Sequence, residues 1–152
     1  MILSVGPSYI SLIPFFSKWV HLLAVIGVAG LIVFARLALT PALRQRGAEA
    51  DSQLAVTIYR RFGILLGIFW LFLILSGALN LVIFWPSTPK IYHLVLIIKV
   101  VLAAFMFLIS MAITHPAPAF ERFRANREAW LSVLLLFIVA IVGLSAFLNS
   151  LH

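Results

Sequence analysis

The sequence predicts an all-α integral membrane protein, a four-helix bundle that runs up-down-up-down through the bilayer. Its 152 residues are 64% hydrophobic and only 10% charged, whereas soluble domains carry about 25% charged residues. The mean hydropathy is +1.20. Four runs reach the roughly 20 apolar residues that a helix needs to cross about 30 Å of hydrocarbon. Because these runs are apolar at odd and even positions alike, they exclude the alternating strands of an outer-membrane barrel.

The order of the apolar runs predicts the elements. Pro86 and Pro89 separate the second helix from the third, and Pro116 and Pro118 follow the third, since proline cannot continue a helix. The connections are short, which favours antiparallel neighbours within a single transmembrane domain. That domain is expected to cover residues 1–152, with helices at about 15–39, 62–85, 91–114 and 129–148.

Basic residues predict the orientation of the bundle. Two connections are rich in arginine, whereas the other side of the membrane carries two lysines. These residues are Arg44 and Arg46, then Arg122, Arg124 and Arg127, and on the other side Lys18 and Lys90. The positive-inside rule places the arginines in the cytoplasm and both termini on the non-cytoplasmic side. The net charge of +7 is therefore assigned to topology and to contact with the lipid bilayer, and nucleic acid is not expected as a partner.

Small residues mark candidate positions of close helix packing. Gly63 and Gly67 form a G-x-x-x-G pattern at the start of the second helix, and Gly27 and Gly30 lie in the first. Such residues let two backbones approach where lipid gives no hydrophobic drive for association. We expect packing inside the bundle, and a homodimer face is the alternative.

Lys99 is the most informative residue, because it lies inside the apolar run 91–114. A charge at the centre of a spanning helix costs about 2.5–3.5 kcal/mol on insertion scales. All four acids lie in the polar connections, where they cannot pair with it at that depth. They are Glu49, Asp51, Glu121 and Glu128. Lys99 therefore snorkels, pairs with dipoles, loses its proton, or meets an anion that the protein does not encode.

Three further polar residues are predicted at a similar depth, in the outer half of the bundle. His21 is embedded among apolar residues of the first helix, and Asn80, with Ser76 one turn below it, belongs to the second. His93 begins the third helix, about 240° around the axis from Lys99. His93 also fits an interface residue, and Asn80 also fits a hydrogen bond between helices.

Five short segments carry a family resemblance. They are residues 18–24 (KWVHLLA), 34–37 (FARL), 59–61 (YRR), 96–100 (LIIKV) and 122–124 (RFR). In them the chain resembles the CopD/HemJ-like membrane proteins, which include the copper-resistance D domain and the HemJ-type protoporphyrinogen oxidase. The resemblance implies a four-helix protein of the bacterial inner membrane. It also implies that His21 and Lys99 form the functional pair associated with b-type haem.

The candidate cofactor is haem b, whose propionates would supply the anion that Lys99 lacks. His21 is the expected axial ligand, His93 a second one, and Asn80 a further cofactor-binding residue. The expected use is membrane redox chemistry, either porphyrinogen oxidation by a HemJ-like oxidoreductase or electron transfer.

Two alternatives stay open. One is a copper binding, transport or homeostasis protein with His21 and His93 as the metal ligands. Cu(I) prefers soft ligands, yet cysteine is absent, and Met106 and Met111 are about 140° apart on one helix. The other alternative is a non-catalytic accessory subunit of a larger membrane complex, in which Lys99 would meet a partner's carboxylate or a lipid phosphate.

Overall fold

A computed structural model describes residues 7–45, 53–84 and 90–150, with side chains described for 12–45, 53–83 and 92–147. The predicted Pro86–Pro89 turn and the acids Glu49 and Asp51 lie outside the described residues. Every regular element in the described part is helical. The elements are α1 (Pro7–Phe34), the π-helix η1 (Ala35–Leu39), α2 (Thr40–Gln45), α3 (Gln53–Phe84), α4 (Lys90–Thr114), the 3-10 helix η3 (Pro118–Phe120), α5 (Glu121–Ala125) and α6 (Arg127–Ser150).

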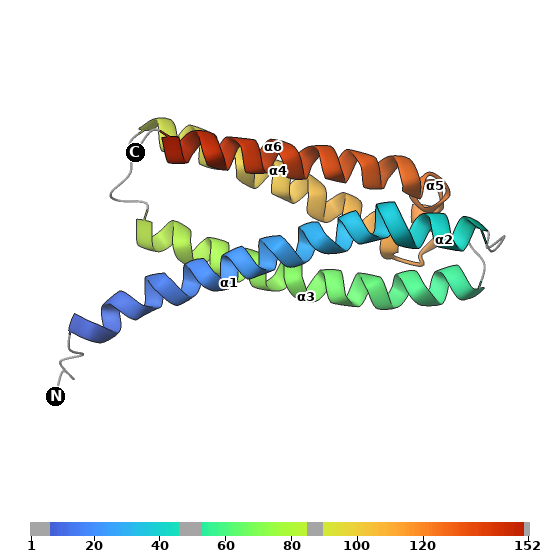
Figure 1. Cartoon of the computed structure of the whole chain (residues 1–152), viewed down its shortest axis with the longest axis horizontal. Coiled ribbons are helices and arrows are strands. Elements are labelled where there is room, and N and C mark those ends of the chain that lie inside the picture. The colour runs from blue at the N-terminus through green and yellow to red at the C-terminus, as the bar shows by residue number, and fades with distance from the viewer. Residues whose placement is uncertain (1–6, 46–52, 85–89, 151–152) are drawn as a thin grey trace.

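Four long antiparallel helices form the bundle, which confirms the predicted fold class (Figure 1). The first is continuous through α1, η1 and α2, and the others are α3, α4 and α6. All four are long and apolar enough to cross a membrane. The first two helices are longer than their apolar runs, because hydropathy marks only the part inside hydrocarbon. The placement of the termini outside the cytoplasm stays a prediction.

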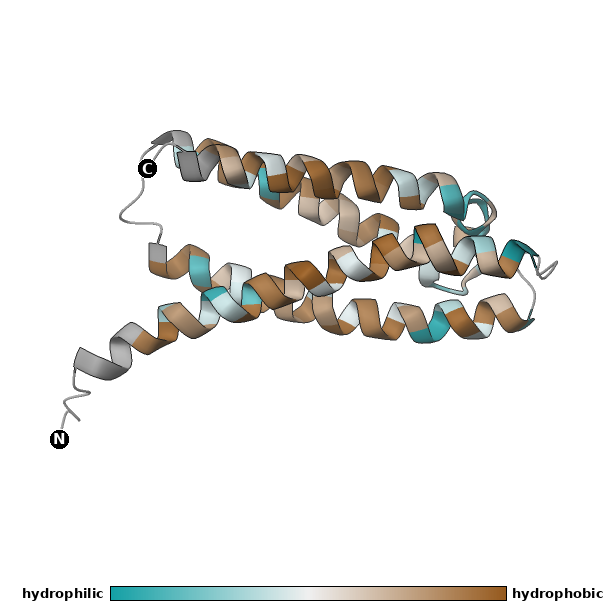
Figure 2. Cartoon of the chain, viewed as in Figure 1, coloured by the Kyte–Doolittle hydropathy of each residue, from teal (hydrophilic) through white to brown (hydrophobic). Residues whose placement is uncertain are grey.

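Each long helix has one inward stripe of buried and half-buried residues spaced by three or four positions, similar to a coiled-coil seam. Most large hydrophobic residues outside this seam are exposed, as contact with lipid requires, and the four long helices are coloured mostly as hydrophobic along their length (Figure 2). We define the seam by these residues: Ser17, His21, Ala24, Val28, Ile32 and Ala35; Tyr59, Phe62, Leu66, Trp70, Leu73, Ser76 and Asn80; Lys99, Ala103, Met106, Ser110 and Ile113; Arg127, Leu131, Leu134, Ile138, Ile141 and Ser145.

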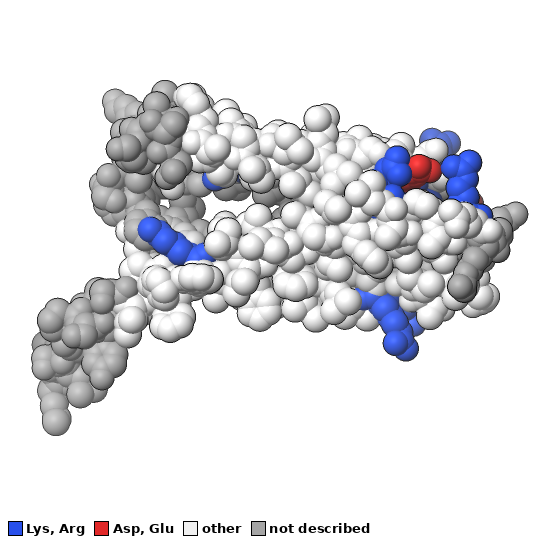
Figure 3. Space-filling model, viewed as in Figure 1, with Lys and Arg blue, Asp and Glu red and all other residues white. Residues whose placement is uncertain are grey.

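The main hydrophobic core cluster lies in the half of the bundle near α5, and Ala24 and Val95 are buried outside it. Its buried members include Ile32, Leu66, Ile113, Leu131 and Leu134. Toward the other end, the pair α1 and α3 diverges from the pair α4 and α6 (Figure 1). The space-filling view has a hollow between the two pairs in this part (Figure 3). We call this half, opposite α5, the open half.

The π-helix coincides with a proline. Pro41 has no N–H with which to close a helical hydrogen bond to the preceding turn, and such defects are commonly absorbed as a π segment. The backbone N–H of Thr40 donates to the carbonyl of Ala35, and the Thr40 hydroxyl reaches the same oxygen at 2.7 Å.

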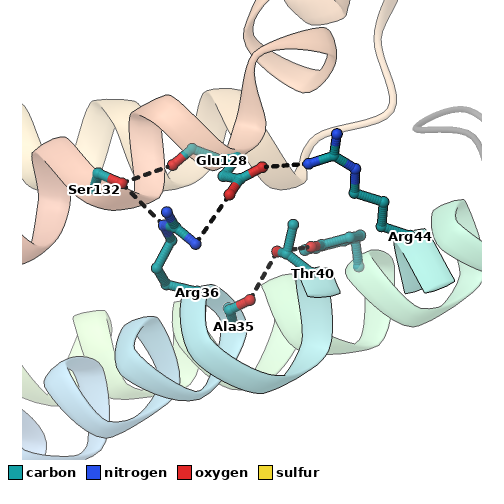
Figure 4. A network of polar contacts seen from close by, with 7 residues as sticks. Ala35, Arg36, Thr40, Arg44, Glu128 and Ser132 are labelled. Carbon is teal, nitrogen blue, oxygen red and sulfur yellow. Dashed lines mark hydrogen bonds and ion pairs between the residues drawn. The ribbon is translucent and has the colours of Figure 1, made fainter. Parts of the chain in front are cut away.

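Arg36, within the π-helix, joins the first helix to α6 (Figure 4). Its Nε donates to Ser132 Oγ at 2.9 Å, and its Nη1 lies 3.1 Å from Glu128 Oε1. Arg44 approaches the same carboxylate at 3.7 Å. These contacts hold the α5 end of the bundle together.

The glycines divide into two kinds. A Cβ at Gly27 would overlap the ring of Phe69, and one at Gly63 would lie 2.9 Å from Thr114 Cβ. These two pack inside the bundle, as expected. Gly30 and Gly67 have open space where a Cβ would stand.

Candidate functional site

His21 is a seam residue of α1 in the open half, and its ring lies against α3. Its Nδ1 is 3.1 Å from Ser76 Oγ. The ring lies close to Gly77, where a Cβ would be in ordinary van der Waals contact with His21 Cε1, at 3.4 Å. One turn earlier, the Ser17 hydroxyl donates to the Ser76 carbonyl at 3.4 Å. The imidazole therefore faces the bundle interior, not the lipid.

The partners of Ser76 assign the tautomer of His21. The Ser76 hydroxyl donates to the Phe72 carbonyl at 2.6 Å, which occupies its one hydrogen. Its oxygen then accepts a hydrogen bond from Nδ1–H of His21. With the proton on Nδ1, Nε2 carries a lone pair that can bind a metal or accept a hydrogen bond. Metal-ligating histidines are commonly fixed in this way by a hydrogen bond from the other ring nitrogen.

Lys99 lies on the seam of α4, and its side chain is half-buried. It is close enough to His21 for the two to interact electrostatically. The two ion pairs to Glu128 lie at the α5 end of the bundle, and no ion pair within the described residues includes Lys99. The counter-charge missing in the sequence is therefore also missing in the described structure.

Asn80 lies on the seam of α3, one turn beyond Ser76 and further from the α5 end of the bundle. Its Oδ1 is buried and has no hydrogen-bond partner within the described residues. A buried acceptor without a donor costs about 1–3 kcal/mol. Asn80 thus keeps a buried acceptor without a donor on the seam of the open half. On α6, the Ser145 hydroxyl donates to the Ile141 carbonyl at 2.7 Å.

His93 does not share the helix face of Lys99. It lies outside the seam of α4, on a helix face about 240° from Lys99. Its ring meets Tyr92 edge-on, with the centroids 6.4 Å apart. The structure thus places His21 and Lys99 within electrostatic range of each other. Asn80 lies on the seam in the same half of the bundle, whereas His93 lies outside the seam.

Sequence reasoning missed three residues of the site, namely Ser17, Gly77 and Ser145. A signal was present: Ser17 precedes His21 by four residues, and Asn80 follows Ser76 by four. Polar residues at helical spacing mark an interior stripe in a chain that is otherwise apolar all round.

His115 has structural contacts, in accord with its position at the end of a helix. Its Nδ1 accepts a hydrogen bond from the backbone N–H of Ala117 at 3.2 Å, and its ring packs edge-on against Phe120. His115 therefore orders the connection from α4 to α5.

Metal ligands are sparse in the described residues, which contain no group of three His, Cys, Asp or Glu side chains able to hold a metal ion. No family model, curated protein or solved structure matches the chain. The resemblance to CopD/HemJ-like proteins therefore stays a prediction. Four apolar helices with an apolar exterior identify an integral membrane protein that contacts the lipid bilayer.

Proposed function

We propose that the open half of the bundle binds haem b, with His21 as the axial ligand and Lys99 as the partner of a propionate. The observation that carries this proposal is the position of the imidazole. It lies inside a diverging membrane bundle, is hydrogen-bonded through Nδ1 to Ser76, and is within electrostatic range of Lys99, which has no carboxylate partner in the described structure.

Each residue of this set fits one part of the ligand. Nε2 of His21 is the ring nitrogen left to bind iron, as in proteins that hold haem by one histidine. The Lys99 ammonium fits a carboxylate, and a charge-assisted pair offsets part of the cost of keeping the ammonium at that depth. The unpartnered Oδ1 of Asn80 can accept a hydrogen bond from a protonated propionate or a water.

The proposed use is membrane redox chemistry. Haem supplies an iron that takes up and releases one electron, at a potential set by the axial ligand and by burial. The chain would hold the ligand by His21, orient its acidic edge by Lys99, and shield it with the apolar faces of the helices. Porphyrinogen oxidation and electron transfer are the two reactions that the resemblance implies.

Copper binding has weaker support. His21 and His93 were the expected copper ligands, but His93 lies outside the seam. The described residues also contain no cluster of three metal-binding side chains. A Lys99 ammonium within electrostatic range of His21 also opposes a metal cation. The same ammonium favours a ligand that brings its own negative charge.

Lys99→Met tests the propionate contact. We expect haem affinity to fall by about ten- to hundredfold, because a hydrogen bond to a charged group contributes about 1.5–3 kcal/mol. The measurement is a titration of the detergent-purified apoprotein with haemin, followed by its visible absorption.

The matched control for this test is Lys18→Met, which removes an exposed lysine from the same end of the bundle. Its affinity is expected to stay within about twofold of the wild type, because exposed charges contribute little. Equal losses of haem affinity in both variants would mean that Lys99 contributes only general electrostatic attraction for an anion and makes no specific contact with a propionate.

A further inference from the structure

A second candidate site lies at the opposite end of the bundle. From the sequence, the arginines at this end were explained by membrane orientation and lipid contact alone. A cavity of about 230 Å³ opens between α3, the end of α4, α5 and α6. Three arginines line it, namely Arg60, Arg124 and Arg127, and none of the described residues that line it is acidic. We propose that this cavity binds a phosphate group.

Arg127 is held in place by two contacts. Its Nε donates to the Ile113 carbonyl at 3.2 Å, and its guanidinium carbon stacks 3.6 Å above the centroid of the Tyr59 ring. Tyr59 is fixed in turn, because its hydroxyl lies 2.8 Å from Thr40 Oγ1. Arginine stacked on an aromatic face is pre-organised, so little side-chain entropy remains to be lost on binding.

Arg124 is fixed by the connection that follows α4. Its Nη1 donates to the carbonyls of His115 and Ala117 at 3.1 and 2.7 Å. Arg124 and Arg127 are both buried, whereas Arg60 is exposed at the mouth of the cavity. Two guanidinium planes are thus set in the wall, and a third can close over a ligand.

The other polar groups of the wall are occupied. The Thr114 hydroxyl donates to the Ser110 carbonyl at 2.8 Å. Thr40 donates to Ala35, so the Tyr59 hydroxyl donates to Thr40. The recognition chemistry of the wall is therefore that of arginine, whose planar fork of N–H donors matches the oxygens of phosphate.

The depth of the cavity agrees with this ligand. Arg60 just precedes the second apolar run, Thr114 ends the third, and Arg127 just precedes the fourth. The cavity therefore lies where the apolar surface ends, level with the headgroups of the adjoining leaflet. The phosphate can belong to an anionic lipid or to a soluble compound, because both present the same oxygens at this level.

The test compares two neighbouring arginines in full-length protein in detergent. Arg60→Gln removes a lining group, and Arg61→Gln removes an exposed charge next to it in sequence that does not line the cavity. The protein is titrated with dioctanoyl phosphatidylglycerol, with inorganic phosphate, or with dioctanoylglycerol, which has the same acyl chains without a phosphate. The readout is the midpoint of thermal unfolding, because a ligand of the folded state raises it.

We expect a saturable rise in the midpoint with phosphatidylglycerol or with inorganic phosphate. Arg60→Gln is expected to raise the half-saturating concentration about tenfold, and Arg61→Gln to leave it unchanged. A response to both phosphates indicates a site for soluble phosphates, and a response to phosphatidylglycerol alone indicates a lipid headgroup. No saturable response, an equal response to dioctanoylglycerol, or equal losses in both variants would overturn the proposal.

Discussion

His21→Ala is expected to abolish haem binding by the purified protein. Removing an outer partner of a metal-ligating histidine already costs about 10–100-fold in affinity, so loss of the ligand itself should exceed about a hundredfold. Ser76→Ala should give an intermediate loss of about tenfold, because the ring keeps its Nε2 but loses the hydrogen bond that orients it. The measurement is the Soret absorbance per protein after size-exclusion chromatography.

His93→Ala is the control for this series, because it removes an imidazole from the same half of the bundle but from outside the seam. We expect it to keep the wild-type amount of haem. The opposite order, with haem lost in His93→Ala and retained in His21→Ala, would contradict the assignment of the axial ligand. Circular dichroism checks that each variant keeps its helices.

Gly27→Val is expected to destabilise the packing of α1 against α3. A Cβ at this position overlaps the ring of Phe69, so the α1–α3 contact must open or the ring must move. Overpacking of this kind costs about 1–3 kcal/mol. The measurement is thermal unfolding in detergent, followed by circular dichroism.

Gly30→Val is the matched control, because it places the same side chain where a new Cβ would have nothing within 4 Å. Both variants place a β-branched residue in the same helix and so share its small effect on helix propensity. Gly30→Val should therefore unfold close to the wild-type temperature. Equal destabilisation of the two variants would mean that α1 and α3 do not approach each other at Gly27.

Hydropathy predicted the fold, because length and apolarity alone decide whether a helix can cross a bilayer. Hydropathy could not show which apolar residues form the seam, since buried and lipid-facing positions are both apolar. The π-helix at Ala35–Leu39 was also missed, although Thr40 and Pro41 mark its position. The first helix continues past the predicted end at residue 39 because Thr40–Gln45 extend it with little hydropathy signal.

The candidate site was predicted in part. His21 and Lys99 are visible in the sequence because a polar residue inside an apolar run needs an explanation. Their proximity depends on how α1, α3 and α4 pack against one another. The spacing of residues within one helix does not reveal that packing. Arg127 shows the same limit, because it looks like any loop arginine until the Ile113 carbonyl and the Tyr59 ring bury it.

The visible spectrum of the wild-type protein tests the central claim most directly. Purified in detergent from cells supplied with a haem precursor, the protein should show a Soret band that shifts on reduction with dithionite. A pyridine haemochrome assay should then give haem b at close to one equivalent per chain. A colourless protein that also fails to bind added haemin would contradict the account.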